Sequence, residues 1–274
     1  MSPLVSIVTP TYNRPGELGE LLEALSRQTY KRLQIVIVND NGESVFPVCK
    51  LYPELDIRVI DSESNRKHVA ARNRGLAEAT GEFVMPCDDD DLLVPTHIET
   101  MVRELVSTGC DMVYSDAEIV DFVREGGVRV PVGRLAFAYE HDLSAMRKFS
   151  TFVPSGSLYR KSLHESIGLF DEDVYHYWDW DFFLRVSERH KVKRVPIAGV
   201  LYAFSQNGGS NLSGQLEDMR PYLNRLSAKH GLGDLPTKNF FLLLEEPDVK
   251  NRQAETTIVW DGAPFRSRYV PDLR

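Results

Sequence analysis

Short apolar runs alternate with stretches of helical spacing along the first half of the chain. Continuous runs rich in β-branched residues, without a polar residue at every second position, are typical of strands covered on both faces. We expect strands at residues 5–9, 33–38, 57–60 and 83–85, and helices at 15–25, 69–79 and 95–107. Because strands that alternate with helices form βαβ units, this pattern predicts an α/β fold with a mostly parallel sheet flanked by helices.

The second half of the chain is less regular. It predicts a strand at 112–115, a hairpin that turns at 125–127, strands at 157–159 and 192–204, and helices at 178–189 and 216–229. No internal repeat and no linker rich in Gly, Ser or Pro divides the chain. We therefore expect one α/β domain over residues 1–213. A C-terminal helical extension and tail over 214–274 would pack on the domain or on a partner subunit of a homo-oligomer.

Composition narrows the classes of protein. The 274 residues are 42% hydrophobic and 26% charged, which is typical of a soluble globular chain. The formal charge of −8 disfavours non-specific binding to nucleic acid or an anionic membrane. Three cysteines without metal-ligand spacing argue against a disulfide framework or structural zinc. No run approaches the roughly 18 apolar residues of a membrane span, so we expect a cytoplasmic protein that associates with a membrane at most peripherally.

Polar residues follow three of the predicted strands. They occupy 9–13, 39–40 and 88–91. Alone, the Asn-Asp-Asn-Gly sequence at 39–42 is typical of a plain turn. In an open parallel sheet, however, ligands bind beyond the carboxyl ends of the strands, where all three segments would meet. The shared position therefore favours a binding site.

Four consecutive aspartates, Asp88 to Asp91, form the most unusual of these segments. The N-terminus of a helix favours one or two carboxylates, but four in a row repel one another unless a cation is present. A divalent ion such as Mg²⁺ or Mn²⁺ binds one or two carboxylates together with substrate phosphates. In an extended segment, Asp88 and Asp90 would point to one side and Asp89 and Asp91 to the other, so that one pair would face the ion and the other a sugar hydroxyl or the helix N-terminus. Cations that could clamp a diphosphate stand just upstream, at Arg66, Lys67, Arg72 and Arg74.

A second candidate centre lies in the predicted helix at 178–189. Asp179 shares the apolar stripe of this helix, whereas Asp181 lies on another side and can pair with Arg185. A carboxylate at the inner end of an apolar stripe either caps the helix or acts as a general base, and the spacing allows both. Trp178 and Trp180 suit either the core or stacking on an acceptor sugar.

Taken together, these segments resemble the inverting nucleotide-sugar glycosyltransferases of family 2, over roughly residues 3–205. The matching motifs, in the order of the family, are VSIVTPTYNRPGELGELLEALSRQTY, IVIVND, NRKHVAARNRGLAEATGEFVMPCDDDDLLVP, GSLYRKSLHESIGLFDED and WDWDFFLRVSERHKVKRVP. The resemblance implies a Rossmann-like fold of the GT-A type. It also implies a metal-dependent enzyme, using Mn²⁺ or Mg²⁺, that moves a sugar from a nucleoside-diphosphate sugar, with a UDP-sugar as the expected donor, to an acceptor nucleophile.

The resemblance also implies roles for single residues. Donor contacts would come from Thr9, Pro10, Tyr12, Asp40, Lys67, Arg72, Asp88 and Asp89. Within this set, the first three would line the base pocket, Asp40 would bind the base and Arg72 would lie near the diphosphate. Asp90 would be the principal metal ligand, with Asp88 beside it, and Asp179 falls on the catalytic base.

The chain departs from the family pattern at three places. Trp178 stands where the family usually has Glu before the base, and Lys67 stands where Gly is common, which would add a phosphate contact. Many relatives place a metal-side histidine after the strand ending at residue 204, but the segment Ser205–Ser210 contains none. We therefore expect Asp90 and the diphosphate to supply most contacts to the metal.

Two other functions compete with glycosyl transfer. A sugar-1-phosphate nucleotidyltransferase would carry a basic, glycine-rich loop after the first strand, and PTYNRPGE matches this poorly. A non-catalytic nucleotide-sugar binding protein would explain the departures at Trp178 and the missing histidine, but Asp179 and the aspartate run are both intact. The acceptor stays open between a glycan, a lipid-linked glycan, a small molecule, a protein and a nucleic acid.

Overall fold

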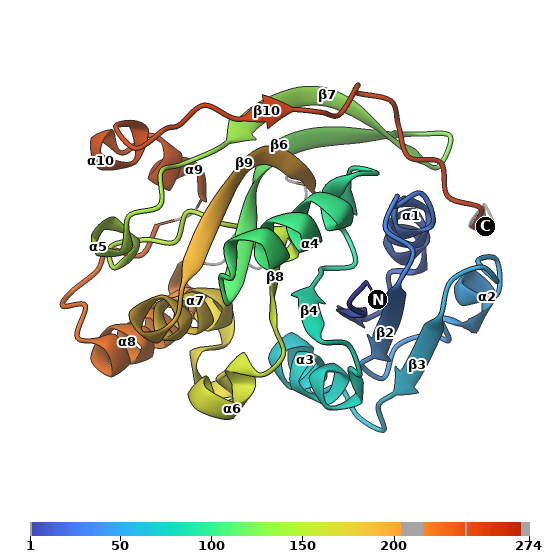
Figure 1. Ribbon diagram of the computed structural model, residues 1–274, viewed down its shortest axis with the longest axis horizontal. Helices are drawn as coiled ribbons and strands as arrows, with labels where there is room; N and C mark the ends of the chain where they lie inside the picture. The colour runs from blue at the N-terminus through green and yellow to red at the C-terminus, as the bar shows by residue number, and fades with distance from the viewer. Residues whose placement is uncertain (1, 204–215, 239, 270–274) are drawn as a thin grey trace.

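A single sheet runs through the computed structural model, which describes residues 2–203, 216–238 and 240–269 (Figure 1). Within these residues the strand order is β10-β9-β6-β8-β4-β1-β2-β3, with β5 paired to β9 and β7 to β6. The strands are β1 (Val5–Thr11), β2 (Leu33–Asn39), β3 (Ile57–Asp61), β4 (Phe83–Pro86), β5 (Leu92–Leu93), β6 (Met112–Glu125), β7 (Val128–Phe137), β8 (Ser157–Arg160), β9 (Val192–Ala203) and β10 (Thr257–Ile258).

Along its main path the sheet is parallel within each of two halves, while β5 and β7 pair antiparallel to β9 and β6. Strands β4, β1, β2 and β3 are parallel neighbours, as are β6, β9 and β10. The short strand β8 joins the halves by pairing antiparallel to both β4 and β6. The predicted α/β class with a mostly parallel sheet is confirmed.

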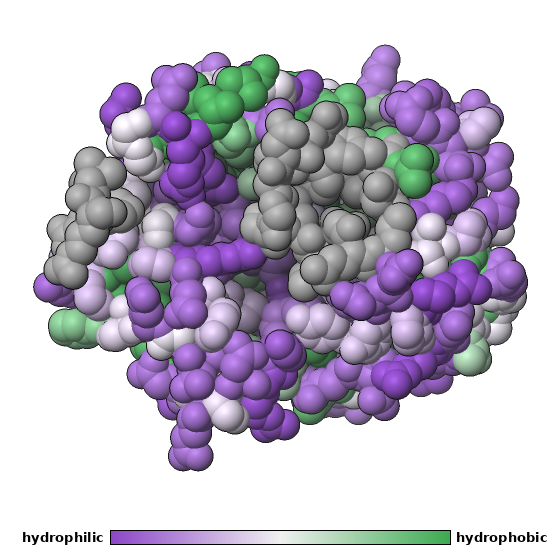
Figure 2. All heavy atoms as spheres, turned by 180° about the vertical axis from the view of Figure 1, so that it is seen from behind, coloured by the Kyte–Doolittle hydropathy of each residue, from purple (hydrophilic) through white to green (hydrophobic). Residues whose placement is uncertain are grey.

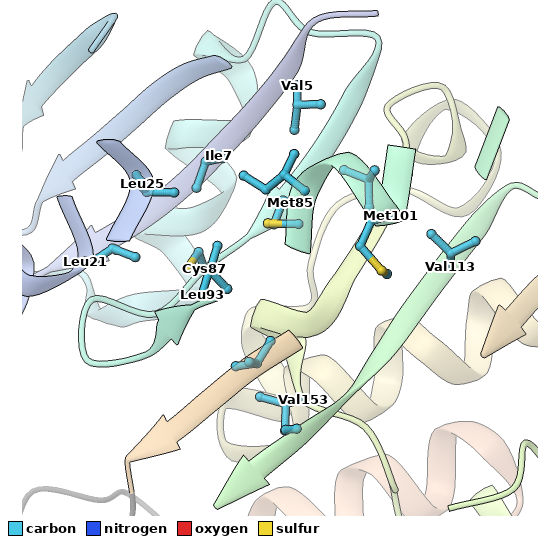
Figure 3. Close-up of a cluster of buried hydrophobic side chains, with 14 of the residues drawn as sticks. Val5, Ile7, Leu21, Leu25, Met85, Cys87, Leu93, Met101, Val113 and Val153 are labelled. Atoms are coloured by element: carbon cyan, nitrogen blue, oxygen red, sulfur yellow. The ribbon is translucent and has the colours of Figure 1, made fainter. Parts of the chain in front are cut away.

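Helices cover both faces of this sheet. They are α1 (Pro15–Ser26), α2 (Phe46–Cys49), α3 (Lys67–Glu78), α4 (His97–Thr108), α5 (Leu143–Met146), α6 (Leu163–Ile167), α7 (Trp178–Arg189), α8 (Leu216–His230), α9 (Phe240–Leu244) and α10 (Pro247–Lys250), with 3₁₀ turns η1 (Pro154–Gly156) and η2 (Glu172–Tyr177). On one face, side chains of α1 and α4 meet alternate residues of β1, such as Val5 and Ile7 (Figure 3). On the other face, Val8 packs in a cluster with residues of α3, α6 and α7.

The structure extends the predicted elements in several places. Strand β6 runs to Glu125 instead of ending near 115, because its residues continue to pair with β9 and then with β7 across the hairpin. The predicted hairpin turn is confirmed, with Gly126 and Gly127 both at positive φ. The short elements β5, β10, α2, α5, α9 and α10 were not expected, since elements this short carry no periodic pattern.

The C-terminal region returns along the whole molecule. Helix α8 is fixed to α7 through Asp181, a fully buried carboxylate that accepts hydrogen bonds from Arg185, Lys229 and His230 at 2.8 Å each. The predicted Asp181–Arg185 pair is thereby confirmed. Further on, β10 extends the sheet beside β9, and the chain then crosses to α1 and α2 (Figure 1), where Arg268 Nη1 donates to the Leu51 carbonyl at 2.9 Å. Division of the chain after residue 213 stays a prediction.

Helix α3 approaches the sheet closely at Gly75. A Cβ placed there would lie 2.6 Å from Val8 Cγ1 and 3.0 Å from Val38 Cγ2, whereas a Cβ at Gly16 in α1 would meet nothing within 4 Å. The glycine therefore allows α3, which begins at the edge of the polar segments, to lie directly on β1 and β2.

We predict that Gly75→Ala lowers the free energy of unfolding by about 1–3 kcal/mol, because the added methyl group overpacks the helix against the sheet. The matched helical change Gly16→Ala should be neutral or stabilising by up to about 1 kcal/mol. Urea unfolding of both variants measures the difference. Equal stability of the two variants would contradict the close approach.

Candidate active site

A cleft of about 490 Å³ opens at the carboxyl ends of β1, β2 and β4. Seen from behind (Figure 2), the molecule presents a hollow with hydrophilic side chains to its left and below it. The lining comes from segments far apart in the sequence: Pro10, Thr11, Tyr12, Arg14, Asp40, Asn65, Lys67, His68, Arg72, Asp88, Asp89, Asp90, Pro154, Tyr175, His176, Trp178, Asp179, Tyr202, Ala203 and Met219. The three post-strand segments therefore meet in one place.

The aspartates at the end of β4 turn instead of extending. Residues 89 and 90 form a turn, and the Asp91 amide donates to the Asp88 carbonyl at 3.3 Å. As a result Asp88, Asp89 and Asp90 all line the cleft, and the alternation expected of an extended segment is wrong. Asp91 instead points into the protein, where it is buried and accepts a hydrogen bond from the Ser155 hydroxyl.

Arg14 is the main cation over this turn. Its Nη1 lies 2.8 Å from Asp90 Oδ2 and 3.3 Å from Asp89 Oδ1. Asp89 also accepts a hydrogen bond from Thr11 Oγ1 at 2.7 Å. Burial and the neighbouring Asp90 carboxylate raise the pKa of Asp89, while Arg14 and Thr11 oppose that shift. The loop after β1 thus compensates the charge at the end of β4.

A second layer of charge supports the turn from behind. Arg129 of β7 donates from Nη1 to the Asp90 carbonyl at 2.8 Å and forms an ion pair with Glu20 of α1. Both side chains are buried. The hairpin of β6 and β7 therefore reaches across α1 and holds the backbone of residues 88–91, which we call the acidic turn.

Arg72 of α3 is the most buried cation of the cleft, with 3% of its surface exposed. It pairs with Asp88, and its Nη1 donates to His68 Nδ1 at 2.7 Å. Burial lowers the pKa of Arg72 to about 10, and the nearby Asp179 carboxylate is the strongest opposing influence. Arg72 thus stays charged at neutral pH and lies between the acidic turn and Asp179.

Asp40 closes the end of the cleft beyond β2. Its two carboxylate oxygens accept the backbone N–H groups of Arg66 and Lys67, at 2.9 and 2.8 Å. Lys67 has a φ of 72°, in the left-handed region that favours glycine, which costs a lysine about 1 kcal/mol. Asp40 therefore orders the start of α3, and a ligand there would meet a carboxylate already bound to two amides.

Asp179 lies partly buried at the N-terminus of α7 and faces the cleft. Removal from water raises its pKa to about 6, opposed by the backbone N–H groups of Trp180 and Asp179 and by the charge of Arg72. A carboxylate with this pKa is ionised at neutral pH and basic enough to accept a proton. Asp179 lies in the first turn of α7 and lines the cleft, and its role as a general base stays a prediction.

Four of the residues predicted for the site lie outside the cleft lining: Thr9, Trp180 and the exposed cations Arg66 and Arg74. Thr9 is fully buried within β1, and Thr11 takes the place in the lining expected of it. Trp180 is buried and donates from Nε1 to the Met146 carbonyl at 2.6 Å, whereas Trp178 lies at the cleft. The segment Ser205–Ser210 lies outside the described residues. The remaining predicted residues line the cleft: Pro10, Tyr12, Asp40, Lys67, Arg72, Asp88, Asp89, Asp90 and Asp179.

Sequence reasoning missed several residues of the site. Arg14 stands in the same post-strand loop as Tyr12, so its position in the sequence could have identified it as a residue of the site. Ser155 and Tyr175 carried no such signal, because neither follows a predicted strand. Tyr175 places its ring 4.3 Å from that of His68, and burial lowers the pKa of His68 well below its usual value.

The carboxylates at the cleft suit a shared rather than a complete metal site. In the part of the chain that the structure describes, no group of three or more His, Cys, Asp or Glu side chains could hold an ion alone. Asp88 and Asp90 nevertheless line the same cleft, and Mg²⁺ and Mn²⁺ are commonly held by one or two carboxylates together with substrate phosphates. The residues therefore fit an ion that arrives with a phosphorylated ligand.

Comparison with known proteins gives concordant matches. A family model described as Glycosyl transferase family 2 matches residues 6–168. The chain is 57% identical over 265 residues to "Uncharacterized glycosyltransferase YwdF" of Bacillus subtilis (strain 168), covering 96% of this chain and 98% of that protein.

Two solved structures share the fold at low sequence identity. TarS of S. aureus in complex with UDP-GlcNAc matches with a TM-score of 0.64 and 19% identity, over 85% of this chain and 68% of that chain. The mannosyltransferase PcManGT from Pyrobaculum calidifontis, in complex with GDP-Man and Mn²⁺, matches with a TM-score of 0.61 and 18% identity, over 86% and 66%. Both are GT-A glycosyltransferases, so the predicted GT-A type is confirmed.

The Glu20–Arg129 pair behind the acidic turn leads to a stability prediction. Arg129→Met should lower the free energy of unfolding by about 3 kcal/mol, because it leaves the Glu20 carboxylate buried without its closest partner. The double variant Glu20→Gln/Arg129→Met should recover at least half of that loss. As a control, Lys148→Met breaks an exposed ion pair with Asp248 and should cost less than about 1 kcal/mol. Urea unfolding measures all three, and a fully stable Arg129→Met protein would contradict the prediction.

Proposed function

Because this chain belongs to glycosyl transferase family 2, we propose that it transfers a sugar with inversion from a nucleoside-diphosphate sugar to an acceptor hydroxyl, with Asp179 as the general base. Membership of this family makes the chain a glycosyltransferase. The donor, the metal ion and the roles of single residues are our proposal. The observation that carries it is a single cleft containing Asp179, the acidic turn and the cation Arg72 between them.

The donor end of the cleft would lie between the loop after β1 and the start of α3. Tyr12 leaves 49% of its surface exposed there, enough for a nucleobase to stack on the ring. Asp40 would accept a hydrogen bond from the base through its remaining lone pairs, and Lys67 and Arg72 would meet the diphosphate. TarS was solved with UDP-GlcNAc and PcManGT with GDP-Man, and we propose a UDP-sugar as the donor.

A divalent ion, Mn²⁺ or Mg²⁺, would be held by Asp90 and Asp88 together with the diphosphate. When bound, it neutralises negative charge on the leaving nucleoside diphosphate. PcManGT, with the same fold, was solved with Mn²⁺. In this chain Arg14 already pairs with Asp90, so the carboxylate keeps a cationic partner before the donor arrives.

The chemical step that the chain's own groups perform is proton transfer. Asp179 would accept the proton of the acceptor hydroxyl. As this proton leaves, the hydroxyl oxygen attacks the anomeric carbon and the bond from that carbon to the diphosphate breaks. Arg72, held between Asp88 and Asp179, would stabilise the charge that develops on the departing phosphate. A single displacement at the anomeric carbon inverts its configuration.

The acceptor class stays open between a glycan, a lipid-linked glycan, a small molecule, a protein and a nucleic acid. Within the described residues, no helix is long and apolar enough to span a membrane. We propose a cytoplasmic enzyme, with at most peripheral contact to a membrane and the C-terminal region as the surface for any homo-oligomer.

We predict that a nucleoside-diphosphate sugar stabilises the protein against heat, more so with Mn²⁺ than with a chelator. A ligand at about 100 times its Kd adds about 2.7 kcal/mol of stability. The measurement is thermal unfolding against UDP, GDP, dTDP, ADP and CDP and their common sugars. Absence of stabilisation by every member would contradict the donor class.

We predict that Asp179→Asn lowers transfer by about 10²- to 10⁴-fold, because the amide cannot accept the proton. Nucleotide affinity should remain near that of the wild type, since the change keeps size and shape. Transfer assays and calorimetry measure the two effects. A variant that binds the nucleotide and retains full transfer would refute the general-base role, and a wild type that binds without transferring would favour a non-catalytic binding protein.

The raised pKa of Asp179 predicts the pH dependence of the reaction. The base must be ionised to work, so kcat/KM should be constant above about pH 6 and fall about tenfold per pH unit below it. Donor affinity, measured over the same range, should change much less. An acid limb near pH 4 would show that Asp179 titrates as an ordinary carboxyl and not as the desolvated base described here.

A further inference from the structure

Trp178 packs on the cation of the cleft. The Arg72 guanidinium carbon lies 4.3 Å from the centroid of the Trp178 ring, within the range of a cation–π interaction. The Phe170 ring meets the same indole edge-on at 4.9 Å, with an interplanar angle of 82°. Trp178 is consequently 6% exposed. Its ring is occupied by the protein itself, which leaves little surface for an acceptor sugar.

Arg72 is further restrained on its donor side. It pairs with Asp88, and Nη1 donates to both the ring nitrogen and the carbonyl oxygen of His68, at 2.7 and 3.2 Å. The guanidinium edge therefore meets Asp88 and His68, while the indole meets its face. Stacking uses none of the N–H donors, so the ring restrains Arg72 without competing for the groups that would bind a phosphate.

The support behind the indole is also built into the fold. Asn73, the residue after Arg72, donates from Nδ2 to the Phe170 carbonyl at 2.9 Å, and its Oδ1 accepts the Phe170 amide at 3.0 Å. These two bonds join α3 to the segment that leads into α7. Because Asn73 is next to Arg72 and Phe170 packs on Trp178, these bonds fix the position of the arginine relative to the indole ring.

The identity of residue 178 changes the charge of the site. A carboxylate there would add a negative charge beside Asp179 and compete with Asp88 for the Arg72 donors. An indole adds no net charge, so the positive charge of Arg72 remains available to an anionic ligand.

We propose that Trp178 is a positioning residue for the donor diphosphate, acting through Arg72: its ring fixes the guanidinium between Asp88 and the cleft by stacking in place of charge. This inference rests on the proposed function, because it requires a diphosphate in the cleft. It replaces the expected acceptor contact of Trp178 with a role on the donor side.

The test is a graded series at this position. Titration calorimetry with UDP, GDP, dTDP, ADP and CDP in the presence of Mn²⁺ first selects the diphosphate that binds the wild type best. Trp178→Leu keeps apolar volume but removes the aromatic face, and we expect its Kd for that diphosphate to rise on the order of tenfold. Trp178→Phe keeps a smaller face, and we expect a rise of about threefold. The order of affinity should be Trp, Phe, Leu.

Two controls separate positioning from general destabilisation. Trp260 lies under Arg134 at 4.6 Å, a similar stacked pair made by residues that do not line the cleft. Trp260→Leu should leave the Kd unchanged. In an Arg72→Gln background, Trp178→Leu should weaken binding by no more than about twofold, because its effect passes through Arg72.

The outcomes are distinct. Two results would overturn the positioning role while leaving the proposed function intact. One is equal affinity of the wild type and the Leu and Phe variants for the diphosphate. The other is a rise in Kd of about tenfold on Trp178→Leu that persists in the Arg72→Gln background. If Trp178→Leu fails to fold, the expected threefold loss in Trp178→Phe and its absence in the Arg72→Gln background decide the question. A wild type that binds none of the diphosphates overturns both the proposed function and this inference.

Discussion

Adjacent carboxylates repel one another, so a folded protein keeps them together by placing a cation or a hydrogen-bond donor beside each of them. The four aspartates at the end of β4 meet this condition through side chains from three separate parts of the fold. Their partners are Arg72 for Asp88, Thr11 and Arg14 for Asp89, Arg14 for Asp90 and Ser155 for Asp91. This requirement brings the loop after β1, helix α3 and the turn η1 to one edge of the sheet. The cleft follows from the same convergence, since Thr11, Arg14 and Arg72 lie in its walls.

Helix α7 presents two carboxylates whose surroundings give them opposite properties. Around Asp181, burial is outweighed by the hydrogen bond from His230 and by the charges of Arg185 and Lys229, which hold its pKa at about 2. Around Asp179, two residues earlier, the backbone N–H groups of Trp180 and Asp179 and the charge of Arg72 do not outweigh burial, and its pKa rises to about 6. One carboxylate therefore anchors α8 while the other can exchange a proton near neutral pH. Such a separation of environments is how a single element supplies both structure and acid–base chemistry.

Much of the fold and the location of the site could be predicted because they depend on local pattern. Helix α7 begins and ends at the predicted residues 178 and 189, and the post-strand segments meet as expected. The individual side-chain contacts could not be predicted from the sequence, because they depend on how far a side chain reaches across the cleft. Ser155 holds Asp91 from a turn that has no pattern of its own. Trp178 and Trp180 point about 200° apart on one helix, so only one of them could face Arg72, and the sequence alone leaves open which one.

The path of the last residues has a consequence for the order in which the protein acquires its structure. Strand β9 pairs with β6 some 80 positions earlier, β10 is added beside β9, and Arg268 then contacts the segment at Leu51. Contacts this distant in sequence are slow to form, since long loops must close before the contacts stabilise them. During synthesis the early βαβ units can assemble first, but their outer surface stays uncovered until the final segment emerges. The interval is a period in which the nascent chain depends on its own local stability to avoid association with other chains.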